Sequence, residues 1–406
     1  MQDSPLVPKI ADWLYRQALV SADIEETVGG LGERLLAGGI PVCRINVGAM
    51  LLHPVLGAVD VTWESRTNTV IAQAVPRHFV TTDGFRNSPF CQMGMHNSRY
   101  ERYDLTDEND RKKYPILERL AGMDITDYAA FSETFGQSRN LGFAGMPPSA
   151  EGSYLSYSTK RRSGFEDQEL DRLRELSLPF SIALKVAVDK QLTMTLLETY
   201  LGKNSGRSVF YGATSRGDGR IIDCVLWYSD LRNSTSLAAS MDMTDYLTLM
   251  NEYYTCTAGA VLEHGGEVLK FIGDGVLAIF PYDPEARPLR DMTNAAVMTA
   301  KDALNRKGSL NRQRQEAGLV PIEFGVGLHV GQVKFGNVGT DQRLDMTVIG
   351  PAVNEVTRYE SMTKELNAPI LTSEDFKQSY YGDLKAFGTH DLKGVATAKQ
   401  VFGVVV

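Results

Sequence analysis

The sequence predicts an α/β (α+β) fold in two or three domains, with one long helix between two mixed halves. The chain has 406 residues, which is more than one typical domain holds. Residues 165–200 carry an apolar repeat of three to four residues, which is typical of a long helix. From Ile221 to the C-terminus, strand and helix patterns alternate, and this alternation indicates a second α/β domain.

The composition is that of an ordinary globular protein. Hydrophobic residues make up 43% and charged residues 23%, and no apolar run approaches the roughly 20 residues that span a bilayer. The formal charge of −8 argues against broad binding to nucleic acids or anionic membranes. The N-terminus lacks a signal-peptide pattern, and the four cysteines show no Cys-x-x-Cys spacing. We therefore expect a cytoplasmic protein with no membrane span and no nucleic-acid partner.

The first half of the chain, residues 1–164, is expected to form one α/β domain. Apolar residues recur at helical spacing around Leu14 and again around Leu31, and a strand pattern then covers residues 42–52. Residues 154–159 show the alternation of another strand. No catalytic pattern is visible in this half.

Residues 165–204 are expected to form a helix that begins with an acidic turn, which the positive end of the helix dipole favours. Pro179 is expected to kink this helix. Two interpretations stay open: the helix packs against its equivalent in a second copy of the chain, or it is a single amphipathic helix that closes the first domain. Residues 205–220 are interpreted as a Gly/Ser/Arg-rich connector, with short strand character at 209–211.

Residues 265–280 predict a hairpin, because apolar, strand-favouring residues flank the corner Gly273-Asp274-Gly275. A carboxylate at the tip of a buried hairpin is costly unless a positive group lies beside it. A metal ion would satisfy Asp274, provided that a second carboxylate lies nearby.

Asp230 is the candidate for that second carboxylate. It ends an apolar run that begins at Ile221, and a helical pattern follows it. The N–H groups of a helix N-terminus favour a phosphate, and Ser234 or Thr235 could cap this helix. Two such carboxylates suit two hard divalent cations bridged by a nucleoside triphosphate. Taken singly, each Asp could equally be an ordinary turn residue or helix cap.

Five segments in one order carry a family resemblance. They are SDLRNST (229–235), GEVLKFIGDG (266–275), GVGLHVGQV (325–333), IGPAVNEVTR (349–358) and LKG (392–394). Residues 221–406 thereby resemble the catalytic domain of the class III nucleotidyl cyclases, which convert ATP or GTP into the 3′,5′-cyclic monophosphate and pyrophosphate. The resemblance implies a ferredoxin-like fold and active sites shared across a homodimer.

The resemblance also implies the metal and phosphate residues. Asp230 and Asp274, with Leu231 in the same set, would hold two Mg²⁺ or Mn²⁺ ions. Asn354 would orient the ribose, and Arg358 would stabilise charge on the α-phosphate from the same helix face. Lys393 would contact the terminal phosphates, and Ser234 and Thr235 would belong to the phosphate-binding turn. The structural alternatives are an ordinary surface helix for Asn354 and Arg358 and a solvated side chain for Lys393.

Base selection would rest on Lys270 and Thr347, which the resemblance places at the two adenine-reading positions. Thr347 departs from the commoner Asp and is similar to a subset of bacterial and soluble adenylate cyclases. Asn233 and Ser234 depart from the usual Gly and Phe in the phosphate turn. The sequence thus predicts an adenylate cyclase that acts on ATP. The alternatives are a guanylate or pyrimidine nucleotide cyclase and a weakly active nucleotide-binding regulatory protein.

The order of the parts resembles the regulatory layout of bacterial cyclases. Residues 1–164 would then be a GAF- or PAS-like sensor for a small molecule of unknown identity. Residues 165–204 would be the signalling helix, 205–220 the transducer and 221–406 the catalytic domain.

Overall fold

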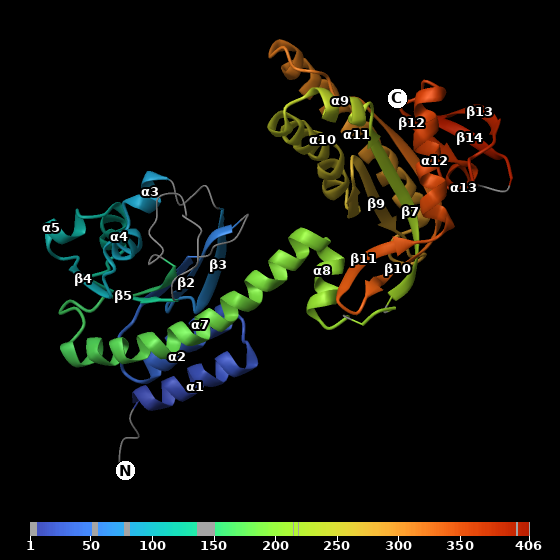
Figure 1. Cartoon of the computed structure of the whole chain (residues 1–406). Helices are drawn as coiled ribbons and strands as arrows, with labels where there is room; N and C mark the ends of the chain where they lie inside the picture. Colours follow the sequence, from blue (N-terminus) through green and yellow to red (C-terminus); the bar gives the residue numbers. More distant parts are fainter. Residues whose placement is uncertain are drawn as a thin grey trace. The chain divides into compact units, whose positions relative to one another are not determined.

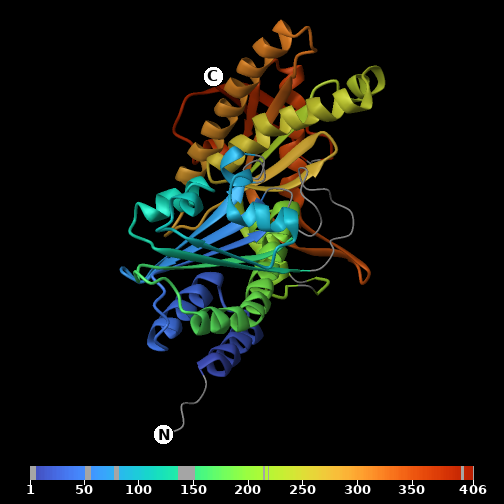
Figure 2. The same cartoon turned by 90° about the vertical axis from the view of Figure 1, so that its left-hand side faces the viewer.

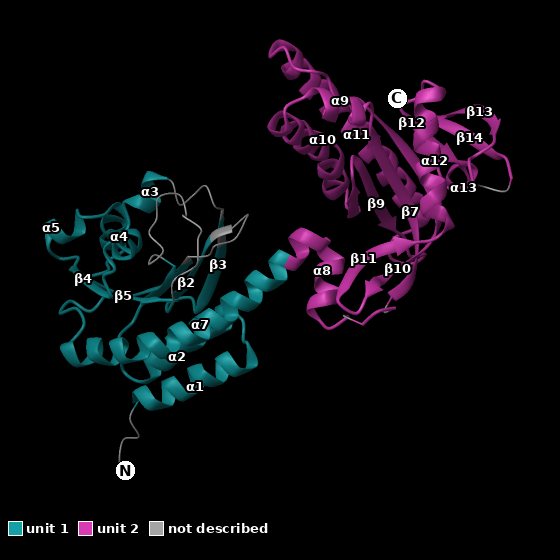
Figure 3. Cartoon of the chain, viewed as in Figure 1, with its two compact units in different colours: residues 1–196 teal, residues 197–406 magenta. Residues whose placement is uncertain are grey.

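The structure is a computed structural model that describes residues 6–50, 56–76, 82–135, 151–213, 215–217, 219–394 and 397–405. The chain divides into two compact units, Met1–Leu196 and Leu197–Val406 (Figure 3). Within the described residues, no helix combines the length and the apolar character that a membrane crossing requires.

Unit 1 is built on a six-stranded antiparallel sheet in the order β3-β2-β1-β6-β5-β4. Its strands are β1 (Arg44–Met50), β2 (Leu56–Glu64), β3 (Thr69–Pro76), β4 (Tyr100–Asp104), β5 (Asp127–Thr134) and β6 (Gly152–Thr159). Figures 1 and 2 show helices α1 (Leu6–Val20), α2 (Ile24–Ala37) and α7 (Asp167–Leu201) on one face of this sheet. The other face carries α3 (Asp83–Arg86), α4 (Pro89–His96), α5 (Glu108–Arg111) and α6 (Pro115–Ala121). The GAF/PAS-like identity of this unit stays a prediction.

The first part of α7 closes unit 1. Its buried residues, from Leu170 to Val188, belong to the same apolar cluster as the inner faces of β1, β5 and β6. No residue of α7 after Val188 is fully buried in the chain. This burial supports the single-amphipathic-helix interpretation for the first part, while pairing with a second copy stays a prediction for the rest. Pro179 lies inside the continuous helix.

The strand character expected at 209–211 is wrong. The segment Lys203–Phe210 forms a short helix, α8, and Tyr211 follows it as its C-cap. Ser205 and Gly206 are buried, and a Cβ at Gly206 would collide with the backbone of α7 at Leu197 and Glu198. Close packing of α8 on α7 therefore overrides the strand preference of the Val-Phe-Tyr run.

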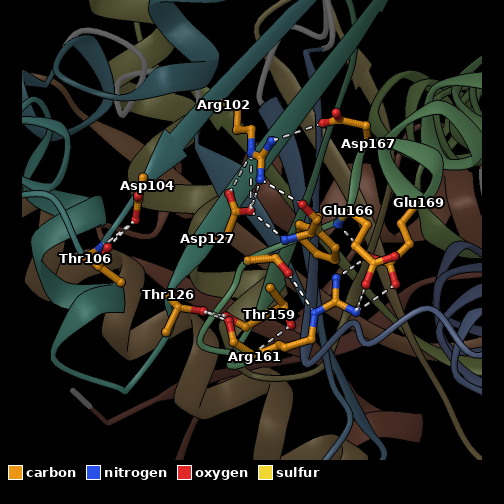
Figure 4. Close-up of polar contacts among 12 residues, drawn as sticks. Arg102, Asp104, Thr106, Thr126, Asp127, Thr159, Arg161, Glu166, Asp167 and Glu169 are labelled. Atoms are coloured by element: carbon orange, nitrogen blue, oxygen red, sulfur yellow. Dashed lines mark hydrogen bonds and ion pairs between the residues drawn. The ribbon is translucent and has the colours of Figure 1, made fainter.

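The N-terminus of α7 is attached to the sheet by two carboxylate–arginine groups (Figure 4). Asp127 is 2% exposed and accepts hydrogen bonds from Arg102 Nη2 at 2.8 Å and from the Phe165 backbone N–H at 2.7 Å. Arg161 forms an ion pair with Glu169 in the first turn of α7. Gly164 has φ +68°, and a Cβ there would collide with Asp127. The loop geometry and the buried carboxylate thus depend on each other.

Asp127→Ala is expected to reduce the stability of unit 1 by about 3 kcal/mol. The substitution leaves the Phe165 N–H and the Arg102 guanidinium without their buried acceptor. Urea denaturation followed by hydrogen exchange of unit 1 amides measures the loss. Asp167→Ala is the control, because Asp167 is 98% exposed and lies 3.9 Å from Arg102, so its loss should stay below about 0.5 kcal/mol. Equal losses in the two variants would contradict the anchoring role.

Unit 2 is built on an eight-stranded sheet in the order β13-β14-β12-β10-β7-β9-β8, with β11 paired to β10. Its strands are β7 (Gly219–Leu231), β8 (Glu267–Ile272), β9 (Gly275–Pro281), β10 (Phe324–Thr340), β11 (Arg343–Ile349), β12 (Ile370–Ser373), β13 (Leu384–His390) and β14 (Lys399–Val404). Its helices are α8, α9 (Ser234–Ser240), α10 (Met243–Glu263), α11 (Leu289–Glu316), α12 (Pro351–Glu365) and α13 (Glu374–Lys377).

The centre of this sheet confirms the ferredoxin-like prediction. The first four strands of the unit, β7 to β10, lie in the spatial order fourth, first, third, second. Helices α9 and α10 connect the first pair of these strands, and α11 connects β9 to β10. The resulting β-α-β-β-α-β unit is the ferredoxin-like motif. Both candidate metal carboxylates lie at one end of its two central strands.

Candidate active site

The hairpin predicted over residues 265–280 is confirmed. Strands β8 and β9 pair antiparallel, and Ile272 lies opposite Gly275, so Gly273 and Asp274 form a two-residue loop. Gly273 has φ +59°, a conformation that suits glycine and the first position of a II′ hairpin turn. A Cβ at Gly275 would collide with the ring and hydroxyl of Tyr228, so this glycine lets β9 pass close to β7. Local turn chemistry thus places Asp274 at the hairpin tip.

Asp230 lies beside Asp274. It is the second-to-last residue of β7 and pairs with Gly275 on one side and Gly325 on the other. The Leu231 backbone N–H donates to the Asp274 carbonyl at 3.3 Å. The pKa of Asp230 is raised to about 6, chiefly by burial and then by the charge of Asp274 and a hydrogen bond between the two side chains. The structure therefore brings together the two carboxylates that the sequence singled out.

A third acidic group, Glu360 on α12, lies against this pair, and sequence reasoning missed it. Glu360 is 6% exposed. Its pKa is raised to about 8, chiefly by burial and then by the charges of Asp230 and Asp274, while Arg232 opposes the rise. The signal in the sequence is the pair of glycines at 325 and 327, where a Cβ would collide with α12. These glycines let α12 approach β10 closely enough to bring Glu360 to the carboxylates.

The carboxylate pair fits hard divalent cations. Asp230 and Asp274 are hard oxygen donors that converge on one another, and a side-chain hydrogen bond joins them. Across the described residues, no group of three or more His, Cys, Asp or Glu side chains is arranged to hold a metal. A cation here would therefore need further oxygen ligands from a backbone carbonyl such as that of Leu231, from water or from a phosphate.

Asn354 and Arg358 lie on α12, four residues apart, as the sequence predicts for one helix face. The Asn354 side chain is exposed and Arg358 is half-buried. Arg358 Nε is buried and has no hydrogen-bond partner in the described part of the chain. A buried N–H without a partner is costly, so Arg358 retains a donor that an anionic ligand could satisfy.

Lys270 and Thr347 are linked through a carboxylate, Asp345, which contacts Lys270 and lies on the same strand as Thr347. Lys270 on β8 forms an ion pair with Asp345 on β11. Asp345 and Thr347 are two residues apart in a strand, so they face the same side. Sequence reasoning missed Asp345 because its contact with Lys270 joins strands that are not neighbours in the sheet. The pair of base-reading positions thus has a third polar group beside it.

The expected phosphate turn differs from the prediction in its capping. Helix α9 begins at Ser234, and its N-cap is Asn233, which has φ +62° and makes no side-chain cap bond. The expectation that Ser234 or Thr235 caps this helix is therefore wrong. Asn tolerates the left-handed conformation better than most residues, so it can replace the family's usual glycine here. The helical pattern expected from Leu237 onward is interrupted at Met241, and Asp242 caps α10 through the Thr244 N–H.

The remaining phosphate candidate, Lys393, is exposed between β13 and β14. Among the described residues, no hydrogen bond or ion pair joins Asp230 or Asp274 to Lys270, Asn354, Arg358 or Lys393.

Glu360→Gln is expected to raise the stability of the metal-free chain above pH 8. The pKa of Glu360 is raised from an ordinary 4.5 to about 8, so the folded state keeps a proton that the unfolded state has released. Stability is therefore lost as the pH rises from about 4.5 to about 8, and Gln, which cannot ionise, removes this loss. Melting temperatures in EDTA between pH 5 and 8.5 measure the effect, with the exposed Glu365→Gln on the same helix as control. Parallel profiles for Glu360→Gln and wild type would contradict the assignment.

Comparison with known proteins agrees with this geometry. Residues 219–396 match the family model of the adenylate and guanylate cyclase catalytic domain. An adenylate cyclase from Anabaena cylindrica is 36% identical over 165 residues, which are 40% of this chain and 31% of that protein. The terminal-differentiation-specific adenylate cyclase of Dictyostelium discoideum is 31% identical over 159 residues, which are 39% of this chain and 7% of that protein. The chain thus spans less than a third of either relative.

Among solved structures, the adenylyl cyclase CyaB from P. aeruginosa is similar at 27% identity and a TM-score of 0.42, over 47% of this chain and 96% of that one. The family match covers the ferredoxin-like centre, the hairpin with Asp274 and helix α12. In residues 219–396, this chain carries a catalytic domain of the adenylate and guanylate cyclase family.

Proposed function

We propose that this protein is an adenylate cyclase, which converts ATP into 3′,5′-cyclic AMP and pyrophosphate. The observation that carries the proposal is the convergence of Asp230 and Asp274 at one end of the central strands, within a catalytic domain of this family. The relatives from Anabaena and Dictyostelium are named adenylate cyclases, which supports ATP as the substrate.

In this proposal Asp230 and Asp274, with the Leu231 carbonyl, would hold two Mg²⁺ or Mn²⁺ ions. Such ions lower the pKa of the ribose 3′-hydroxyl and neutralise charge on the triphosphate. The 3′ oxygen forms a bond to the α-phosphorus, the bond to the pyrophosphate oxygen breaks, and the 3′ proton is released to solvent. Burial disfavours the charged form of Asp230 and so raises its pKa. Bound cations would offset this unfavourable free energy.

The other residues of the proposed site position the nucleotide. The Arg358 guanidinium donates to the α-phosphate as charge develops there, and Asn354 orients the ribose from the same helix face. Lys393 binds the terminal phosphates. Ser234 and Thr235, at the start of α9, stay candidates for the triphosphate turn.

Two copies of the chain would complete each site. In the part that the structure describes, no hydrogen bond or ion pair joins Asp230 or Asp274 to Asn354 or Arg358. A head-to-tail homodimer would bring Asp230 and Asp274 of one copy to Asn354 and Arg358 of the other. The resemblance of residues 221–406 to the class III cyclases, which implies shared sites, supports a homodimer as the active form.

Base selection would be performed by Lys270 and Thr347. Lys270 donates to adenine N1, and the Thr347 hydroxyl accepts from the exocyclic amine. Asp345 holds the Lys270 ammonium next to β11, close to Thr347. The Asp345 carboxylate accepts a hydrogen bond from the Lys270 ammonium and so orients this side chain.

The test is turnover of the purified protein with ATP, GTP, CTP and UTP in separate assays with Mn²⁺. We expect cyclic AMP as the main product, with at least about tenfold preference for ATP over GTP, since a misplaced hydrogen bond to the base costs about 1.4 kcal/mol or more. A preference for cyclic GMP would overturn the ATP assignment. No cyclic product from any of the four would overturn the enzyme assignment.

A further inference from the structure

Unit 1 contains a cavity of about 640 Å³ that no part of the proposed reaction uses. It lies on the face of the sheet opposite α1, α2 and α7, between strands β1 and β2 and helices α3, α4 and α6. Its volume is in the range of pockets that hold small organic molecules. All of the residues that line it lie in unit 1 and in the part of the chain that the structure describes.

The alternation of β1 builds this cavity. Ile45 and Val47 point to the helix-covered face and are fully buried in the main apolar cluster of unit 1. Arg44, Asn46 and Gly48, which alternate with them, line the cavity. The sequence Arg-Ile-Asn-Val-Gly thus gives one strand an apolar face and a polar face. A polar face at the centre of a sheet is unusual for a strand that only supports a core.

The two arginines in the cavity favour an anionic ligand. Arg44 and Arg119 both line it, and burial lowers the pKa of Arg44, with a smaller contribution from the charge of Arg119 and with Asp60 opposing it. Arg44 donates to Thr62 Oγ1 at 3.1 Å. It makes no ion pair within 4 Å among the described residues. Two guanidinium groups that face one cavity without a bound carboxylate are the arrangement that recognises a planar anion.

One acidic residue limits the charge of the ligand. Asp60 also lines the cavity, and it accepts a hydrogen bond from Asn46 Nδ2 at 3.0 Å. With two arginines and one aspartate, the cavity has one net positive charge. A ligand with a single negative charge matches it, and a second negative charge would meet Asp60.

Aromatic side chains from the sheet and from the helices also line the cavity. Phe90 and Tyr154 have ring centroids 5.6 Å apart, and Phe85 and Tyr128 also line the cavity. A Cβ at Gly48 would come within 3.1 Å of the Phe90 ring, so this glycine allows the ring to lie over β1. Aromatic side chains of this kind pack well against the flat body of an aromatic ligand.

We propose that this cavity binds a small aromatic monocarboxylate. Its carboxylate would lie between Arg44 and Arg119, and its ring would pack against Phe90 and Tyr154. This site is separate from the proposed cyclase site, so its existence does not depend on the cyclase assignment.

The test is isothermal titration of the full-length protein with naphthalene-2-carboxylate, indole-3-acetate and 4-hydroxybenzoate. We expect saturable binding of at least one acid, at one site per chain, and binding of its carboxamide at least about tenfold weaker, because a charge-assisted hydrogen bond is lost. Naphthalene-2,6-dicarboxylate should bind more weakly than the monoacid, because its second charge meets Asp60. A naphthyl phosphate that binds tighter than the carboxylate would replace the carboxylate with a phosphate ester as the ligand class.

Variants separate this site from unspecific binding. Arg119→Gln should weaken the acid at least about tenfold and preserve the fold, since Arg119 is exposed. Arg44→Gln should have the same effect, with circular dichroism to check folding. Arg66→Gln, an exposed arginine outside the cavity, should leave affinity unchanged. Failure of all three acids to bind, equal binding of acid and amide, or unchanged affinity in Arg119→Gln would each overturn the proposal. Cyclase activity is not the readout, so a failure here leaves the proposed reaction standing.

Discussion

Asp274→Asn is expected to lower cyclic AMP formation by at least about a hundredfold at saturating Mn²⁺. The amide keeps the shape of the hairpin tip but removes the negative charge that would hold a cation beside Asp230, and such cations supply several kcal/mol of transition-state stabilisation. Initial rates with ATP, at several Mn²⁺ concentrations, measure the loss. Asp245→Asn, an exposed aspartate on α10, is the matched control and should keep wild-type rates. Retained activity in Asp274→Asn would remove the two-metal mechanism.

The same variant has a second readout that a purely structural role would not give. In the metal-free chain, the charge of Asp274 raises the pKa of Asp230, so the two carboxylates repel each other. Neutralising Asp274 removes that repulsion, and the melting temperature in EDTA at pH 8 should stay equal or rise. Loss of both activity and stability would instead indicate that Asp274 holds the hairpin together. Activity lost with stability kept is the expected result.

Mixing Asp230→Ala and Asn354→Ala protomers is expected to restore about a quarter of wild-type activity, although each variant alone should be inactive. Equal amounts of the two chains give about half heterodimers if the copies associate at random. In each heterodimer, one site contains both substitutions and the other contains neither. Co-expression with two different affinity tags allows the heterodimer to be purified and its activity measured per dimer.

The control pair is Asp230→Ala with Asp274→Ala. Both substitutions affect the metal-binding half, so every site of the heterodimer carries one of them and no activity should return. Rescue in both pairs would indicate exchange or contamination rather than shared sites. No rescue in the first pair, with heterodimers confirmed, would show that each chain holds a complete site.

Much of unit 2 could be predicted because its signals are local. The Gly273-Asp274-Gly275 corner needs only the backbone preferences of glycine and the flanking strand residues, and the hairpin formed where the sequence places it. The four-residue spacing of Asn354 and Arg358 gives one helix face in the same way. Capping was predicted less well, since Asn233 rather than Ser234 or Thr235 holds the N-cap. A helix boundary depends on the conformation of one residue, which periodicity does not report.

Local signals fail where packing between separate segments decides the structure. The strand preference of residues 209–211, at the start of unit 2, was overridden by packing of α8 on α7. The buried Asp127, which joins the sheet to the start of α7, looks like an ordinary strand residue in the sequence. The polar alternation of Arg44 and Asn46 was present in the sequence, but alternation alone does not distinguish a solvent-facing side from a cavity wall.

The sequence by itself determined the carboxylate hairpin and the helix face, because turn chemistry and periodicity act over a few residues. The ferredoxin-like fold of the catalytic domain followed from the resemblance that the five segments carry. The tertiary structure alone decided which distant groups meet. Glu360 reaches Asp230 because Gly325 and Gly327 let α12 lie close to β10. Arg44 and Arg119 face one cavity because a strand and a helix far apart in the chain pack around it. Such contacts between distant residues depend on strand register and close packing across the whole unit, and no short stretch of sequence encodes them.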